Sequence, residues 1–314
     1  MKSFIRFNYK KAFWLSIIVV ILLLIIDIIL FDYIRFVKDN NSSYIVKYFI
    51  YDIPELKEEK KNGSVPPVID VKPKVNDFKK KVSSERKKKK TANSIFKVAI
   101  IIDDLGQNPE TVSTLIGINK PLTFAILPHL HFSKEIATRA KKADQEVILH
   151  LPLEPLPSPD IVCDQTFLLT SMTDDEIISK LRKFIAEVPY IKGVNNHMGS
   201  MFTSNKTKMT VVLNELKANN LFFIDSRTIA RSVAYKIAKD INMRAGIRNV
   251  FLDSKPGEAF AKKKLVELVR YAKKTGKAIG IGHPNTTTIK VLQEVLPNIE
   301  NQGIILVHVS EIVE

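Results

Sequence analysis

Cysteine is almost absent from this sequence, in which Cys163 is the only one among 314 residues. A single thiol cannot form an intramolecular disulfide, which excludes the small disulfide-stabilised folds that are common among secreted proteins. The stability of any folded part of the chain must therefore come from the burial of apolar side chains.

A signal-peptidase cleavage site is also missing, although the chain begins like that of an exported protein. Residues 12–26 form an unbroken stretch rich in Ile, Leu and Val, which resumes after Asp27 and continues through Phe31. Such a span reaches the roughly 20 residues that a bilayer-crossing helix needs. Basic residues precede it, and no small-x-small motif follows. We expect residues 1–37 to hold a cytoplasmic N-terminus and a single transmembrane anchor, with the rest of the chain on the periplasmic or extracellular side of the cytoplasmic membrane. A cleaved signal peptide is the alternative.

Apolar residues are too sparse between residues 38 and 94 to build a core. This segment holds 15 Lys or Arg and 8 Asp or Glu, with an Asn-Gly-Ser-Val-Pro-Pro sequence at 62–67 and a basic block at 86–90. The composition predicts a disordered, extended linker. In an exported segment, the basic block favours spacing or contact with anionic lipid or wall polymer over binding to nucleic acid.

From residue 95 onward, short β-prone runs alternate with helical patterns. We predict strands at 98–102, 122–126, 147–149, 193–195, 222–224, 250–252, 278–281 and 304–307, and helices at 207–219, 233–241, 258–274 and 287–296. A further helix is expected to begin after Thr173, which forms a capping box with Glu176, and to stop at Pro189. The repeated order of strand and helix predicts one α/β domain over 95–314, with a parallel sheet that is either barrel-like or doubly wound.

The first polar cluster lies at the end of the first predicted strand, in Ile-Ile-Asp103-Asp104-Leu-Gly106. Two adjacent carboxylates repel each other unless a cation or a shared proton relieves them. At a transition from strand to loop, both side chains can turn toward one site, one as a metal ligand and the other as a base. A helix cap or an ordinary loop pair is the alternative.

Two further clusters follow later strands. In Ile-Leu-His150-Leu-Pro-Leu-Glu154, the histidine and the carboxylate are both ordinary zinc ligands, and two prolines make the loop rigid. The segment from Asn195 through Asn196 and His197 to Ser200 offers one ligand together with hydrogen-bonding groups for a polar substrate. A structural histidine and a polar turn, respectively, are the alternatives.

The remaining candidates are spread over the other strand ends. We predict Asp225 and Arg227 to lie among the substrate-binding residues, where Asp225 could orient a base or an imidazole and Arg227 could pair with an acid. A structural pair between the two is at least as consistent with the sequence. His283 lies in Gly280-Ile-Gly-His-Pro284 and could protonate a leaving amine. We interpret His129 and His131 as loop residues and His308 as a core residue of the last strand.

Taken in order, these motifs resemble the divergent polysaccharide deacetylase family, a branch of the carbohydrate deacetylases that act on chitin, peptidoglycan and related polymers. The resemblance covers residues 97–314. It rests on Ile-Ile-Asp-Asp-Leu-Gly, Leu-Thr-Phe-Ala-Ile-Leu-Pro, Leu-His-Leu-Pro-Leu-Glu-Pro, Gly-Val-Asn-Asn-His-Met-Gly-Ser, Phe-Ile-Asp-Ser-Arg-Thr and Ile-Gly-His-Pro.

The resemblance implies a distorted (β/α) barrel of about seven parallel strands, with a divalent metal, usually zinc, at its top. Asp103 then corresponds to the catalytic base, Asp104 to a metal ligand, His150 to the first histidine of the metal motif and His283 to the general acid. Where the wider superfamily has a second histidine four positions after the first, this chain has Glu154. We expect His197 to be the third ligand, with Glu154 as the alternative.

The activity that the resemblance implies is metal-dependent hydrolysis of N- or O-acetyl groups on an envelope polysaccharide such as peptidoglycan. Asp103 would accept a proton from the attacking water, and His283 would protonate the departing amine. A carbohydrate-binding protein without turnover is one alternative, supported by the replaced histidine. A structural envelope protein that acts through the basic linker is another.

Overall fold

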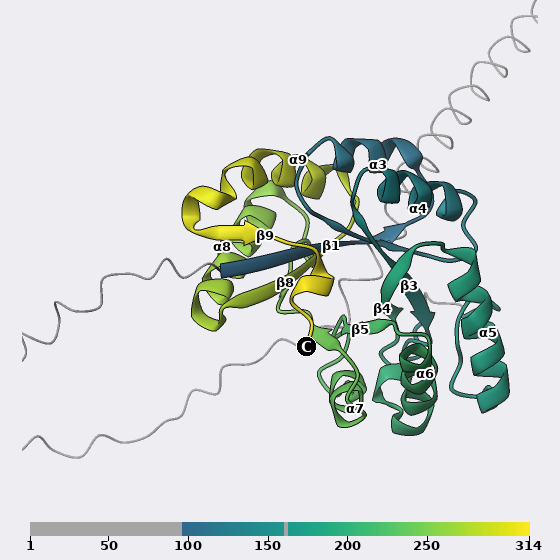
Figure 1. Ribbon diagram of the computed structural model, residues 1–314. Coiled ribbons are helices and arrows are strands. Elements are labelled where there is room, and N and C mark those ends of the chain that lie inside the picture. Colours follow the sequence, from purple (N-terminus) through teal and green to yellow (C-terminus); the bar gives the residue numbers. More distant parts are fainter. Residues whose placement is uncertain (1–95, 160–162) are drawn as a thin grey trace, which may run out of the picture. The chain divides into compact units, whose positions relative to one another are not determined.

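The computed structural model describes residues 96–159 and 163–314 (Figure 1). The predicted anchor and linker lie outside the described residues. Within these two ranges, no helix has the length and apolar character that crossing a membrane requires.

One sheet of nine parallel strands forms the centre of the domain. The strands are β1 (Phe96–Leu105), β2 (Thr123–Ile126), β3 (Glu146–Leu153), β4 (Ile191–Met198), β5 (Phe222–Asp225), β6 (Ala245–Ile247), β7 (Val250–Phe251), β8 (Lys277–Gly282) and β9 (Ile304–Leu306). Their order in the sheet is β6-β5-β4-β3-β2-β1-β8-β7, and β9 pairs with the beginning of β1. Every pairing is parallel, as the alternation of strands and helices predicted.

The sheet curls into an open barrel. Strands β6 and β7 are its two ends. The curl brings β6 close to β8, since a Cβ atom on Gly246 would lie 2.8 Å from Cδ1 of Ile279. The prediction of about seven strands was therefore too low. Strand β6 was missed because three residues with a central glycine show no alternation of apolar and polar side chains.

Helices cover the outer face of the sheet (Figure 1). They are α3 (Pro109–Ile116), α4 (Ser133–Lys142), α5 (Asp174–Glu187), α6 (Lys206–Ala218), α7 (Ala234–Asp240), α8 (Glu258–Thr275) and α9 (Thr286–Val295), with short 3-10 turns η1 (Phe202–Ser204), η2 (Leu296–Gln302) and η3 (Val309–Glu311). The capping box of Thr173 and Glu176 at the start of α5 is confirmed. Helices α3 and α4 were not predicted, because α4 buries only Ser133, Ile136 and two alanines and so shows little apolar periodicity.

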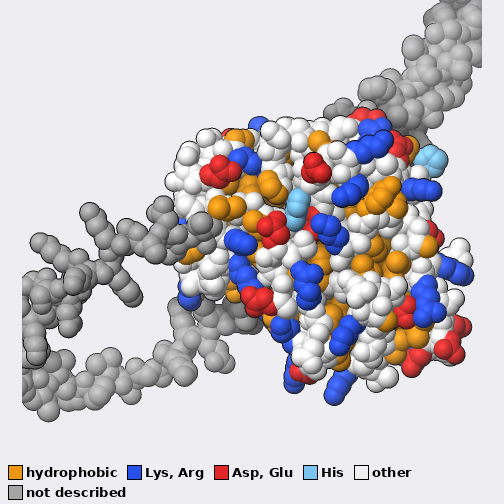
Figure 2. Space-filling view, viewed as in Figure 1, with side chains coloured by type: hydrophobic (Ala, Val, Ile, Leu, Met, Phe, Trp, Pro, Cys, Tyr) orange, Lys and Arg blue, Asp and Glu red, His pale blue; other side chains and the backbone are white. Residues whose placement is uncertain are grey.

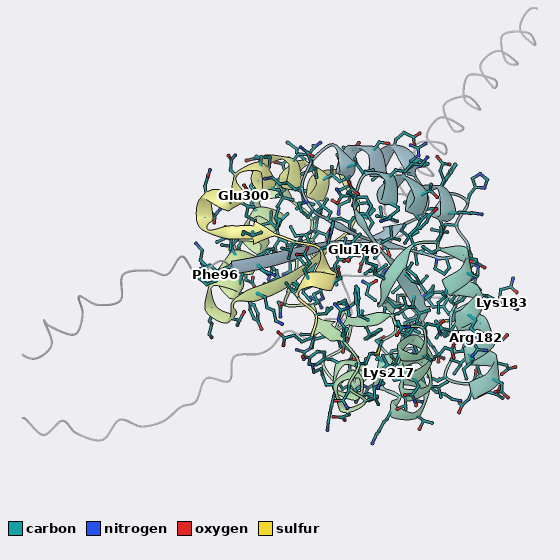
Figure 3. All side chains as sticks on the ribbon, viewed as in Figure 1. Phe96, Glu146, Arg182, Lys183, Lys217 and Glu300 are labelled. Carbon is teal, nitrogen blue, oxygen red and sulfur yellow. The ribbon has the colours of Figure 1, made fainter. Side chains whose placement is uncertain are left out.

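Charged residues lie on the outer surface. Figure 2 shows one face of the domain, where Lys and Arg side chains are spread out with acidic side chains among them. Some of these charges link neighbouring helices: the Arg182 side chain on α5 donates two hydrogen bonds to the Glu215 carboxylate on α6, at 2.8 and 3.1 Å (Figure 3).

The sheet buries apolar side chains on both faces, and the inner face determines where the site lies. Successive strand residues point to opposite faces. The inner cluster contains Ala99 and Ile101 of β1, Ala125, Ile148, Phe222, Ile224, Ile279 and Ile281, together with Val307, Val309, Ile312 and Val313 of the C-terminal segment. The C-terminal segment thus packs against the inner face of the sheet.

His308 is not the core residue of a strand that we predicted. Strand β9 ends at Leu306, two residues before it, and His308 is half-buried at the N-cap of η3. The strand stops early because the chain turns into η3, where the His308 amide donates to the Glu311 carboxylate at 3.1 Å. His129 and His131 lie in the loop between β2 and α4, as predicted.

Candidate metal centre

Several of the predicted site residues lie on the inner face of the sheet, beyond its apolar side chains. In four places a site residue lies two positions beyond an inward-facing residue, in the C-terminal half of a strand or directly after it, where α/β proteins place their chemistry. The pairs are Ile101 and Asp103 on β1, Ile148 and His150 on β3, Gly193 and Asn195 on β4, and Ile281 of β8 with His283, the first residue after that strand. His197 follows Asn195 by two more positions.

Asp104 joins the site through a backbone irregularity. Strict alternation would turn its side chain away from the barrel interior, because Asp103 already faces inward. Asp104 instead has φ +55, and the register between β1 and β2 shifts between Ile102 and Leu105. The left-handed backbone conformation is uncommon for a residue other than glycine and concentrates at functional sites. Both carboxylates are consequently buried at the same strand end.

Three potential metal ligands lie within contact distance of one another. The Oδ1 atom of Asp104 is 3.1 Å from Nε2 of His150 and 2.9 Å from Nδ1 of His197, and the two nitrogens are 3.2 Å apart. The ligand atoms of a tetrahedral zinc ion, with bonds of about 2.1 Å, are about 3.4 Å apart. The spacing of the three atoms therefore suits a metal ion of this size. Among the buried side-chain atoms of the described residues, Asp104 Oδ2 has no hydrogen-bond partner, which also favours a ligand at this position.

Asn195 fixes the orientation of the first histidine. The Asn195 amide nitrogen donates to Asp103 Oδ1 at 2.8 Å, which turns the amide oxygen toward His150. That oxygen lies 2.8 Å from His150 Nδ1, so Nδ1 donates, and in the neutral ring Nε2 then carries the lone pair. This is the tautomer that a metal at Nε2 requires. Asn195, which we predicted as a substrate-binding residue, thus connects the candidate base to a candidate ligand.

The charges of the centre stabilise one another. Burial alone would raise the pKa of Asp104, but His197 and His150 outweigh this effect and hold it well below its usual range. Burial would lower the pKa of His150, whereas Asp103 and Asp104 raise it. Asp104 is therefore ionised at neutral pH, as a metal ligand must be.

The pKa of Asp103 is displaced in the opposite direction from that of Asp104. Burial raises the pKa of Asp103, and the attraction of His150 and His283 offsets this effect only in part. Its Oδ2 atom lies 3.7 Å from His150 Nε2. Two adjacent carboxylates with pKa values displaced in opposite directions suit different chemical tasks.

His283 has a carboxylate partner that the sequence reasoning missed. Asp253, which follows β7, lies 3.0 Å from His283 Nδ1 through Oδ1 and accepts the His283 amide at Oδ2, 2.8 Å away. The Oδ2 atom also accepts hydrogen bonds from Asn285 and Thr288. Burial alone would lower the pKa of His283, but Asp253 raises it to about 9. The signal was present in the sequence, because Asp253 is an acid directly after the predicted strand 250–252.

Glu154 lies outside the group of potential ligands in the described structure. Its carboxylate accepts hydrogen bonds from the backbone and the hydroxyl of Thr170, at 2.6 and 2.5 Å. Its backbone oxygen accepts from Met201 and Phe202. Glu154 thus connects the loop after β3 to the segment after β4, and His197 is the residue that stands beside Asp104 and His150.

The other predicted substrate residues hold loops in place. Asn196 accepts the Ser226 amide at 2.8 Å, and Ser200 Oγ accepts the Leu156 amide at 2.8 Å. Asp225 accepts hydrogen bonds from Ser232 and from the backbone amides of Arg227 and Tyr235. Arg227 is exposed at φ +48.

Arg248 was not predicted, yet it lies beside this centre. Its guanidinium donates to the backbone oxygens of Ser226 and Arg227, at 2.6 and 2.9 Å, and stacks over Phe251 at 4.9 Å. Burial lowers the pKa of Arg248, and Asp103 counteracts that effect. No sequence pattern marked it, because it lies in the short connection between β6 and β7.

The sequence of this chain matches a known protein family and two curated proteins. Residues 100–313 match the sequence profile described as divergent polysaccharide deacetylase. The chain is 36% identical over 203 residues to the uncharacterized protein YibQ of Escherichia coli K12, an alignment that covers 65% of this chain and 63% of that protein. It is 34% identical over 203 residues to an uncharacterized protein of Haemophilus influenzae, covering 65% of this chain and 72% of the other.

A solved structure shares the fold. An uncharacterized protein from Agrobacterium tumefaciens aligns with a TM-score of 0.66 at 26% identity, over 69% of this chain and 89% of that chain. The aligned part spans less than two thirds of the Escherichia coli relative. The profile match nevertheless includes every strand-end residue described above, from Asp103 to His283. The chain belongs to the divergent polysaccharide deacetylase family.

Proposed function

We propose that this protein is a metal-dependent deacetylase that removes N- or O-acetyl groups from an envelope polysaccharide. The observation that carries the proposal is the close grouping of Asp104, His150 and His197 beside Asp103 and His283. Membership of the divergent polysaccharide deacetylase family supports an acetylated polysaccharide as the substrate.

Asp104, His150 and His197 are the residues that would hold the metal, and we propose zinc. Two imidazole nitrogens and one carboxylate oxygen form a donor set typical of catalytic zinc sites, which use three protein ligands and leave one position open. When bound, the ion would polarise the acyl oxygen and lower the pKa of the attacking water.

Asp103 would act as the general base. Its carboxylate is buried and adjacent to the ligand group, and burial makes it a stronger proton acceptor than an exposed aspartate. Asn195 donates to its Oδ1, so Oδ2, which faces His150, is the oxygen that would take the proton.

His283 would act as the general acid. Its Nδ1 is held by Asp253, and its Nε2 lies 3.7 Å from Asp104 Oδ2, so the ring presents Nε2 to the centre. With its pKa raised to about 9, the imidazole is protonated at neutral pH and can donate to the departing amine or alcohol. Acetate and a free amino or hydroxyl group on the sugar would be the products.

The proposed location rests on the N-terminal sequence. Basic residues before an apolar stretch of membrane-spanning length favour an anchor in the cytoplasmic membrane, with the domain on its outer side. Protease added to spheroplasts should then degrade the domain while leaving a cytoplasmic control protein intact.

The test of the enzyme proposal combines metal analysis with acetate release. We expect the purified full-length chain to release acetate from β-1,4-linked N-acetylglucosamine oligomers or from peptidoglycan, to lose this activity in EDTA and to regain it with Zn²⁺. Asp103→Asn should reduce the rate by about 10²- to 10⁴-fold, the usual contribution of a positioned general base. Asp240→Asn, which changes an exposed aspartate of α7, is the matched control.

Bound zinc without acetate release from any acetylated glycan would contradict the proposal. That result, with glycan binding retained, would instead support a carbohydrate-binding protein without turnover.

A further inference from the structure

A cavity lies at the opposite end of the barrel from the candidate metal centre. Its volume is about 410 Å³, and it is lined by residues at or before the N-terminal ends of β3 and β4 and by His308. We call it the basal cavity and define it by Lys141, Glu146, Tyr190, Lys192 and His308. Glu146 and His150 are four residues apart on β3, so the two sites are about 13 Å apart along the strand.

Glu146 brings an incompletely bonded carboxylate into the basal cavity. Only 2% of the residue is exposed. Its Oε1 accepts hydrogen bonds from Thr123 Oγ1 at 3.1 Å and from the Ser310 amide at 3.0 Å, next to the C-terminal segment (Figure 3). Its Oε2 is buried and accepts no hydrogen bond from any described residue, and the Lys192 ammonium is 3.8 Å away. A buried carboxylate oxygen that accepts no hydrogen bond favours the binding of a ligand that can donate one.

His308 brings an unpaired ring nitrogen to the same cavity. Its backbone oxygen accepts the Glu311 amide at 3.1 Å. Its Nε2 is buried and has no hydrogen-bond partner within the described ranges. A ring nitrogen donates or accepts according to the tautomer, and a hydroxyl group can pair with either form. The cavity is therefore flanked by one acceptor, Glu146 Oε2, and one ring nitrogen, His308 Nε2, neither of which is satisfied by a described residue. A metal ion fits poorly, because the Lys192 ammonium group adjoins the carboxylate.

Tyr190 contributes an exposed aromatic ring to the cavity, although its backbone has a strained conformation. It lies in the connection between α5 and β4 with φ +67, and 54% of the residue is exposed. A bulky residue in the left-handed region is an outlier, and such strain collects at ligand sites. Glycine would adopt this backbone without strain. A tyrosine that is strained yet largely exposed points to a contact outside the domain.

We propose that the basal cavity binds a sugar unit of a polysaccharide. A sugar hydroxyl both donates and accepts, so hydroxyls of the sugar can donate to Glu146 Oε2 and pair with His308 Nε2 in either tautomer of its ring. The C–H face of the sugar ring packs against Tyr190, and Lys141 and Lys192 donate to further hydroxyls. Water could satisfy Glu146 and His308, but it would make no use of the aromatic ring. The inference requires no turnover and stands independently of the proposed deacetylase activity.

Binding measured by calorimetry tests the proposal. The purified full-length chain, kept in EDTA, is titrated with the β-1,4-linked N-acetylglucosamine tetramer and with cellotetraose. We expect at least one of the two to bind, and Tyr190→Gly to weaken that binding by at least about tenfold, as the loss of a central aromatic contact does. Glu146→Gln should weaken it as well. Tyr271→Ala, which changes an exposed tyrosine of α8, should leave it unchanged.

Two results would overturn the proposal. One is the absence of binding of both tetramers to the unaltered chain. The other is equal affinity of the unaltered chain and Tyr190→Gly, which would assign any binding to the opposite end of the barrel. The thermal midpoint of Tyr190→Gly separates binding from folding, since removal of the strained conformation should leave it unchanged or raise it.

Discussion

At the scale of single residues, the candidate metal centre depends on one aspartate in an unusual backbone conformation. Asp104 at φ +55 places its carboxylate between His150 and His197 rather than on the outer face of the sheet. The conformation costs about 1–3 kcal/mol, which the surrounding structure must compensate. Asn195 completes the arrangement by fixing the tautomer of His150. The chemistry of the site therefore depends on the partners of the ligands as much as on the ligands.

Asn195→Ala should weaken zinc binding by about 10- to 100-fold, because loss of the partner of a metal-bound histidine frees the ring to rotate and to change tautomer. Competition with a chromophoric chelator measures this effect. Glu154→Gln is the matched control and should retain full affinity, since Glu154 bonds to Thr170. A loss of zinc in Glu154→Gln but not in Asn195→Ala would show that the ligands are assigned wrongly.

At the scale of elements, the site is assembled by close packing of neighbouring strands. Gly193 of β4 is next to Phe222 of β5, its partner in the sheet register. A Cβ atom on Gly193 would lie 2.3 Å from the Phe222 ring. Because Gly193 has no side chain, the Phe222 ring can occupy this space inside the barrel. Asn195 and His197 follow Gly193 at intervals of two residues and therefore lie on the same face of β4.

Gly193→Ala should lower the free energy of unfolding by about 1–3 kcal/mol, the usual result of overpacking a core. Urea denaturation followed by circular dichroism measures the change. The same substitution at Gly117, an exposed residue with φ −61, should change stability by less than about 1 kcal/mol. Equal stability of Gly193→Ala and the unaltered chain would mean that the Phe222 ring moves without cost.

At the scale of the whole molecule, the C-terminal segment completes the core. Val307, Val309, Ile312 and Val313 belong to the inner cluster. The Ala245 amide of β6 donates to the Glu314 backbone oxygen at 2.8 Å. Residues 307–314 are thus packed against the inside of the same sheet that carries the candidate metal centre at its other end.

Truncation after Leu306 should abolish cooperative unfolding. Four buried aliphatic side chains contribute about 1.5–3 kcal/mol each, a sum close to the whole stability of a typical domain. A thermal melt followed by near-ultraviolet circular dichroism tests this expectation. Val266→Ala, which alters an exposed valine of α8, should melt like the unaltered chain. A sharp melt of the truncated chain at an unchanged temperature would show that the segment is dispensable.

Much of the site could be predicted because it repeats one local rule. Polar residues directly after apolar runs marked the ends of strands, and parallel strands bring those ends together. That rule located Asp103, His150 and His283. It did not find β6, whose three residues are too few for a pattern, and it overlooked Asp253, although Asp253 directly follows the predicted strand 250–252.

The sequence by itself determined the class of fold, the order of strands and helices, and the strand ends that carry chemistry, because these follow from residue spacing along one chain. Only the tertiary structure decided that His197 rather than Glu154 stands beside Asp104 and His150, and that Glu146 and His308 share a cavity. Those relations join residues far apart in the sequence. Their distances depend on the curl of the sheet and on a single positive φ, which no local pattern encodes.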